Sequence, residues 1–291
     1  MDLFKPLSAV IPVFLLVAIG FTFAHWKKIS LAAVTEIIVY LAAPCLVFTA
    51  LATKPIFAAD IVVMFFGAVG ILVGVGVLIW AYFRLFQFKS RGFALPVLFM
   101  NAGNMGIPLS LFAFGPPGLQ RASLMFVIMS VFQYSLGIYI LSGKGNWAEI
   151  FRLPLIYATL AGLSFNLSQV SIPEMIFQPL NMLGYSTIPL MLVSLGYRLH
   201  DVRSLRWGHS LGGAFLRIFG GLLAAYVTAT IIGAQGINRQ ILLLYGSLPA
   251  AVVNFILTEK YNQDPDLAAS IVVLSTLLSV ATIPCVLWFI L

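Results

Sequence analysis

Long apolar runs follow one another along the whole chain, separated by short charged or glycine- and proline-containing breaks. A helix needs about 20 apolar residues to cross the hydrocarbon core of a bilayer. The pattern therefore predicts ten helical spans, five in each half of the chain. The expected spans are about 7–25, 31–52, 58–83, 92–114 and 118–142 in the first half, and about 153–170, 175–199, 211–233, 239–259 and 266–290 in the second.

Composition supports a membrane protein and excludes several other classes. Of the 291 residues, 61% are hydrophobic and 9% are charged, and the mean hydropathy is +1.05. A soluble domain carries about 25% charged residues, so a soluble enzyme, a disordered chain and a nucleic-acid-binding domain are excluded. We therefore expect an all-α polytopic membrane protein, with no room left for a soluble domain.

The basic residues predict the orientation of the spans. Of the 16 Lys and Arg residues, eleven fall in the loops after odd-numbered spans and four on the opposite side. Loops rich in Lys and Arg stay in the cytoplasm. We therefore expect both termini outside, in a multi-pass protein of the cell membrane. The eleven residues are Lys27, Lys28, Arg84, Lys89, Arg91, Lys144, Arg152, Arg198, Arg203, Arg206 and Lys260.

The two halves of the chain resemble each other at an offset of 145 residues. Tyr40-x-x-x-Pro44 in the second span matches Tyr185-x-x-x-Pro189 in the seventh, and residues 100–108 match residues 245–253. Because each half has an odd number of spans, the second half must be inserted upside down, as in many secondary transporters. The expected organisation is a first five-helix repeat over 1–142, a cytoplasmic linker over 143–152 and a second, inverted repeat over 153–291.

The stretch from residue 100 to residue 108 is the strongest candidate for a substrate site. It reads Met-Asn-Ala-Gly-Asn-Met-Gly-Ile-Pro and begins about ten residues after Arg91, near the expected bilayer midplane. Glycine and proline weaken a helix. Irregular backbone survives at that depth only where it lines a cavity or is buried in protein. The candidate residues are Asn101, Gly103, Asn104, Gly106 and Pro108.

The ninth span has a matching weak point at Ser247-Leu248-Pro249, followed by Asn254. Two broken helices that cross at mid-membrane direct half-helix N-termini at an anion and unwound carbonyl groups at a cation. We therefore expect Pro249 and Asn254 to join residues 101–108 in a crossover. A simpler interpretation stays open, in which both stretches are proline kinks with glycines for close helix packing.

These motifs resemble those of the auxin efflux carrier family. The pattern Asn-x-Gly-Asn-x-Gly-x-Pro at residues 101–108 is similar to a motif in that family's fourth helix, and Leu248-Pro249-x-x-x-Val253-x-Phe255 is similar to its ninth. The resemblance covers most of the chain and suggests a bacterial-type, PIN-like transporter. It implies ten helices in two inverted repeats, with helices one, two, six and seven as a scaffold and the others as a moving domain.

The resemblance also implies a function. Bacterial members are linked with small organic anions such as malate or malonate, and plant members export auxin. Asn101 is then the best candidate for substrate contact, with Asn104 and Pro249 in the crossover. Plant carriers have a polar residue where this chain has Leu155, which argues against auxin itself. The resemblance also suggests a homodimer. The scaffold-side candidates are Pro44, Tyr157 and Pro189.

Charged residues inside the spans form a second group of candidates, because charge in the membrane is costly and commonly functional. Glu36 and Arg217 each lie a few residues from the cytoplasmic end of a span. At that depth they either pair or snorkel, or they take part in coupling or in attracting the substrate. No carboxylate falls at the midplane, so the coupling ion, a proton or sodium, stays open.

The sequence thus predicts a secondary active transporter of a small organic anion that works by alternating access. One alternative is a sodium-coupled symporter of the bile-acid type, although Ala250-Ala251-Val252 stands near the place where those carriers have a glutamate and a glutamine. Another alternative is a membrane sensor that binds a ligand without moving it. The sequence has no nucleophilic triad, metal site or phosphate-binding motif, so no enzyme activity, metal or cofactor is expected.

Overall fold

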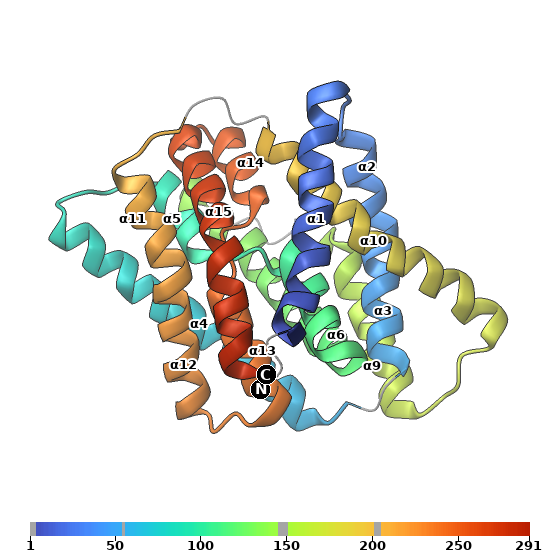
Figure 1. The fold of residues 1–291 in the computed structure, drawn as a ribbon. Coiled ribbons are helices and arrows are strands. Elements are labelled where there is room, and N and C mark those ends of the chain that lie inside the picture. Colours follow the sequence, from blue (N-terminus) through green and yellow to red (C-terminus); the bar gives the residue numbers. More distant parts are fainter. Residues whose placement is uncertain (1–3, 54–55, 145–150, 201–204) are drawn as a thin grey trace.

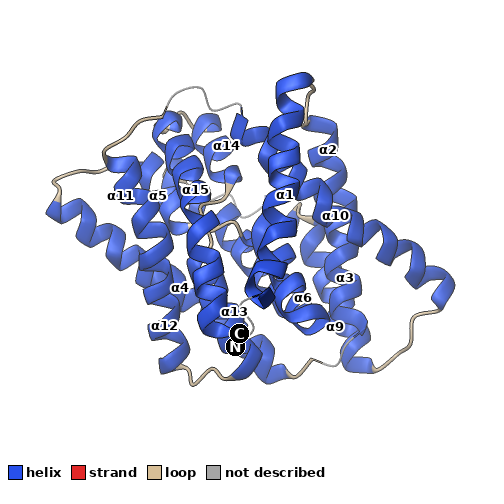
Figure 2. Ribbon diagram, in the orientation of Figure 1, coloured by secondary structure: helices blue, strands red, loops and turns tan. Residues whose placement is uncertain are grey.

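The computed structural model describes residues 4–53, 56–144, 151–200 and 205–291. Within these ranges the secondary structure is helical, apart from one isolated β-bridge (Figures 1 and 2). Seven helices of the described residues are long and apolar enough to cross a membrane. The predicted all-α polytopic membrane protein is therefore confirmed.

The helices of the first half follow the apolar runs of the sequence, and π-helical turns, written η, join some of them end to end. In chain order they are α1 (Phe4–Trp26), α2 (Ala32–Ile37), η1 (Ile38–Ala42), α3 (Ala43–Thr53), α4 (Ala58–Leu85), α5 (Arg91–Leu98), η2 (Ala102–Gly106), α6 (Ile107–Phe132), η3 (Gln133–Gly137) and α7 (Ile138–Ser142). Gly115 interrupts α6 with a left-handed φ of 67° and is followed by Pro116 and Pro117. This kink falls between the fourth and fifth predicted spans.

The second half contains both long and short helices. They are α9 (Pro154–Ser168), α10 (Glu174–His200), α11 (His209–Phe215), η4 (Leu216–Gly220), α12 (Gly221–Ile231), α13 (Gly236–Ser247), α14 (Val252–Lys260) and α15 (Pro265–Ile290). Helix α9 is 15 residues long, and α13 and α14 are separated by non-helical residues. Helical segments thus occupy every predicted stretch, while the ten-span inverted repeat and its boundaries stay predictions.

The helices pack as two groups with α6 between them (Figure 1). One group contains α1, α3, α9 and α10, and the other contains α4, α5 and the helices from α11 to α15. Within the first group α1 and α10 approach closely, because Gly20 lies against the backbone of Val193 and Gly196 against the backbone of Val17. A side chain at either glycine would collide with that backbone. The site described next has walls from both groups.

Candidate substrate site at a helix crossover

Two helices are interrupted where they meet. Helices α5 and α13 end because Phe99 and Leu248 adopt extended backbone conformations, with ψ values of 113° and 147°. The extended segments then pair with each other in an antiparallel bridge. The Asn101 N–H donates to the Pro249 carbonyl at 2.7 Å, and the Ala251 N–H donates to the carbonyl of Phe99 at 3.2 Å. Each break therefore satisfies backbone groups of the other, and the two chains form a crossover.

The crossover has two faces of opposite polarity. On one face the second half-helices begin, η2 at Ala102 and α14 at Val252. On the other face α5 and α13 end. The N-terminus of a helix carries a partial positive charge and its C-terminus a partial negative charge. The N-terminal face therefore suits an anion, and the C-terminal face suits a cation.

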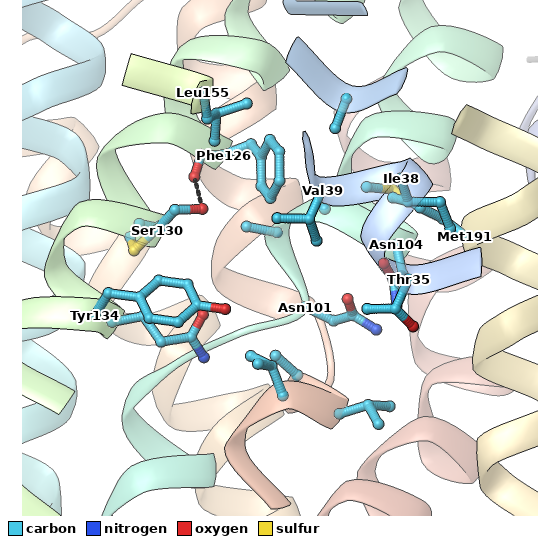
Figure 3. Close-up of a pocket in the computed structure, with 18 of the residues that line it drawn as sticks. Thr35, Ile38, Val39, Asn101, Asn104, Phe126, Ser130, Tyr134, Leu155 and Met191 are labelled. Carbon is cyan, nitrogen blue, oxygen red and sulfur yellow. Dashed lines mark hydrogen bonds between the residues drawn. The ribbon is translucent and has the colours of Figure 1, made fainter. Parts of the chain in front are cut away.

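A cavity of about 190 Å³ lies against the N-terminal face of the crossover (Figure 3). Residues 100–104 and 251–253 form one wall, and residues of η1, the start of α9 and α10 form another. Phe126, Ser130 and Gln133 of α6 and η3 complete it. Among the described lining residues there is no Asp or Glu. An apolar cavity with a few polar groups is typical of a site for a small molecule.

Asn101 is the polar side chain best placed to bind a ligand (Figure 3). It is 3% exposed and lines the cavity, and its Nδ2 atom has no hydrogen-bond partner within the described part of the chain. Its backbone N–H and C=O bond to Pro249 and Gly106, which holds the residue in position. Gly103 and Asn104 also line the cavity. The site therefore offers a buried amide donor beside two helix N-termini.

Arg198 belongs to the cavity, although the charge pattern of the sequence places it with the cytoplasmic loops. It lies in the last turn of α10 and lines the wall opposite the crossover. Its Nη2 donates to the Thr35 hydroxyl at 2.9 Å, which holds the guanidinium beside the start of the second predicted span. Ser194, one helical turn earlier, lines the same cavity. In the sequence, the spacing of four residues between Ser194 and Arg198 already places both side chains on the same face of a helix.

Asn254 and Gly106 support the crossover from behind and do not belong to the described cavity lining. Asn254 is fully buried, and its Nδ2 donates to the Phe99 carbonyl at 2.8 Å while its Oδ1 accepts from Gln133 at 2.6 Å. A Cβ at Gly106 would lie 2.7 Å from the ring carbon Cζ of Tyr245. These contacts determine where the two extended segments cross.

Several other predicted residues lie away from the cavity. Pro108 is buried in the first turn of α6. On the scaffold side, Pro44 is buried in α3, Pro189 is exposed on α10, and neither is among the described lining residues. Tyr157 is exposed, and its hydroxyl donates to a backbone carbonyl at 2.9 Å. Leu155, two residues earlier, lines the cavity instead (Figure 3).

Glu36 and Arg217 do not pair. Glu36 is exposed on α2, whereas Arg217 is completely buried in η4. The Arg217 guanidinium donates to three backbone carbonyl oxygens, those of Val97, Leu98 and Gly246, at distances of 2.9, 3.1 and 2.9 Å. These carbonyls belong to the last turns of α5 and α13. Arg217 therefore lies at the C-terminal face of the crossover, away from the described cavity lining.

Interrupted helices that cross beside an internal cavity are a feature of membrane carriers. In the described residues, no group of three or more His, Cys, Asp or Glu side chains is placed to hold a metal ion. A family model described as membrane transport protein matches residues 6–287, and the chain belongs to this family.

Several relatives agree with this assignment. The chain is 27% identical over 304 residues to an uncharacterized transporter of Methanocaldococcus jannaschii, and the match covers 96% of each protein. It is 29% identical to an uncharacterized transporter of Methanothermobacter thermautotrophicus, over 86% of this chain and 85% of that protein. Auxin efflux carrier component 1 of Arabidopsis thaliana is 22% identical over 140 residues, which are 46% of this chain and 22% of that carrier. The resemblance to the auxin efflux carrier family is confirmed.

Proposed function

We propose that this membrane transport protein is a secondary active transporter. It moves a small organic anion across the cell membrane by alternating access at the crossover cavity. One observation carries the proposal. Two helix N-termini and Nδ2 of Asn101, which has no hydrogen-bond partner among the described residues, converge on a cavity whose described lining has no carboxylate. The helix N-termini carry partial positive charge and Nδ2 of Asn101 is a donor without an acceptor in the described part of the chain, and an anion supplies both negative charge and an acceptor.

The walls of the cavity favour a carboxylate with a short body. The crossover and Asn101 form one group that can bind a carboxylate, and the Arg198 guanidinium on α10 forms a second one. A dicarboxylate such as malonate or malate presents one carboxylate for each of the two groups. An auxin-like acid instead places one carboxylate at the crossover and its ring against Phe126 and Leu155, which are apolar parts of the same lining. We propose the dicarboxylate as the first substrate class to test.

The cavity reaches toward the helix ends that the charge pattern assigns to the cytoplasm. Thr35 near the start of α2, Pro154 at the start of α9 and Arg198 at the end of α10 all line it. The start of α1 and the end of α15 lie at the opposite end of the molecule (Figure 1). This arrangement supports an inward-open conformation with both termini outside. In the proposed cycle, the group with the crossover moves against the group with α1 and α10.

Uptake by proteoliposomes that contain the purified full chain tests the proposal. Labelled malonate, malate and indole-3-acetate are offered in turn, with an imposed proton gradient, a sodium gradient or neither. We expect uptake of at least one anion that protein-free liposomes lack and that Asn101→Ala reduces. Binding of an anion without uptake would favour the sensor. Neither binding nor uptake of any of the three would contradict the proposal.

A further inference from the structure

The C-terminal face of the crossover, which favours a cation, already contains a positively charged side chain. Arg217 is 0% exposed, and its three hydrogen bonds to described residues reach the last turns of α5 and α13. The surrounding backbone makes room for the guanidinium through glycine. A Cβ at Gly221 would collide with Nη2 of Arg217 and with the carbonyl of Gly246. The surrounding backbone therefore forms a specific binding position for the Arg217 side chain.

The positive charge of Arg217 is balanced at this position without a carboxylate. The C-termini of α5 and α13 each carry about half a negative charge, and a guanidinium carries one full positive charge at any physiological pH. Neither of the ion pairs found within the described residues includes Arg217; they join Arg121 to Asp60 and Arg206 to Asp264. The guanidinium is thus neutralised by two helix ends.

In carriers with interrupted helices, the C-terminal ends of half-helices and unwound carbonyls are the groups that coordinate a coupling sodium ion. We propose that Arg217 is a resident cation that occupies the place of such an ion. Anion binding on the opposite face then needs no sodium. This inference rests on the proposed transport of an anion and predicts that this transport is independent of sodium.

The resident charge also acts on the anion. Leu98, which accepts from Arg217, and Asn101, which lines the cavity, are three residues apart, so at most about 11 Å of extended chain separates them. A unit charge about 10 Å away, at an effective dielectric constant of about 20, changes the affinity for a monoanion about tenfold. Loss of Arg217 should weaken anion binding by this factor even when the fold is retained.

Two variants and two controls test the inference in the full chain. Arg217→Ala removes the cation and retains the carbonyl groups that it bonds. Gly221→Ala keeps Arg217 but places a methyl group against its guanidinium and against the Gly246 carbonyl to which it donates. Arg84→Ala alters an exposed arginine on α4, and Gly76→Ala alters a glycine whose added Cβ meets no atom within 4 Å. The controls should retain wild-type behaviour.

Uptake of the best anion among malonate, malate and indole-3-acetate is the first readout. Wild-type uptake should be equal in sodium chloride and in choline chloride. At low substrate concentration, Arg217→Ala should take up the monoanion indole-3-acetate about tenfold more slowly than the wild type, and the dianions malonate and malate more slowly still. Gly221→Ala, which retains the charge, should take up the anion more slowly than the wild type. Methylguanidinium should restore a large part of the rate of Arg217→Ala, because it can donate to the same carbonyls. A purely structural role would not give this rescue.

Thermal unfolding of the detergent-purified proteins is a second readout, independent of any substrate. Methylguanidinium should raise the melting temperature of Arg217→Ala and leave that of the wild type and Arg84→Ala unchanged. If the wild type transports none of the three anions, the proposed function fails, and this measurement still tests the resident cation. If Arg217→Ala does not fold, Gly221→Ala and the sodium test of the wild type decide.

Three results would overturn the inference. The first is wild-type uptake that requires sodium. The second is a folded Arg217→Ala protein with wild-type uptake. The third is a folded Arg217→Ala protein whose uptake and melting temperature do not respond to methylguanidinium.

Discussion

Replacing Asn101 by alanine should separate binding from stability, because the side chain affects the two in opposite directions. The Asn101 amide is 3% exposed, and its Nδ2 has no acceptor within the described residues. A buried donor without a partner costs about 1–3 kcal/mol. The backbone bonds of Asn101 to Pro249 and Gly106 do not depend on the side chain. We therefore expect the ligand-free variant to be at least as stable as the wild type.

Anion binding should respond in the opposite direction. A hydrogen bond from an amide to a carboxylate is worth about 1.5–3 kcal/mol, which corresponds to a Kd weakened about 10- to 150-fold. Calorimetric titration of the detergent-purified protein with malonate, malate or indole-3-acetate measures this change. Thermal unfolding of the same samples measures stability.

Asn254→Ala is the matched control, because it removes the same kind of side chain from a fully bonded position. Both amide atoms of Asn254 have partners, in Phe99 and Gln133. Its loss should lower the unfolding free energy by about 1–3 kcal/mol. The reasoning would be refuted if Asn101→Ala lost more than about 1 kcal/mol of stability, or if it bound the anion with wild-type affinity.

Three further predictions follow from the contacts at the ends of the cavity and of the molecule. Asp60→Asn leaves Arg121 without a carboxylate partner at 2.9 Å, in a site where both side chains are at most 12% exposed; thermal unfolding should show a loss of about 3 kcal/mol, and an unchanged melting temperature would contradict it. Arg198→Gln should weaken malonate binding about tenfold more than indole-3-acetate binding, because only malonate presents a second carboxylate; equal losses in calorimetry would argue against a second carboxylate-binding group at Arg198. In a cysteine-free background, Lys144→Cys should react with an impermeant maleimide from the cytoplasmic side and Gln235→Cys from outside, and the reverse pattern would overturn the orientation.

The helical framework follows from the sequence because apolar length determines what a bilayer accepts. The weak points at 100–108 and 247–249 are visible for the same reason, since proline, glycine and asparagine stand out in an apolar run. The two interrupted segments are far apart in the sequence, yet they hydrogen-bond to each other, for example through Asn101 and Pro249. Local sequence contains no information on such a pairing beyond the similarity of the two halves.

The partners of charged side chains were the least predictable part of the site. Arg198 has the position of a loop anchor in the sequence, and only the packing of α10 beside α2 brings it to the cavity. Arg217 was correctly recognised as embedded, but its partners are backbone carbonyls, which every residue has and which no motif marks. Of the alternatives that the sequence leaves open, pairing with the exposed Glu36 is therefore not the one that the structure adopts. Side-chain chemistry alone does not reveal an arginine that neutralises helix ends.

Counterflow in proteoliposomes tests the central claim most directly. Liposomes that contain the purified protein and are preloaded with unlabelled malonate are diluted into a trace of labelled malonate. A carrier that alternates around one site accumulates the label transiently against its gradient. We expect this overshoot for the wild type, with or without sodium, and a strongly reduced overshoot for Asn101→Ala. An absence of overshoot with malonate, malate and indole-3-acetate alike, in wild-type protein shown to be folded, would contradict it.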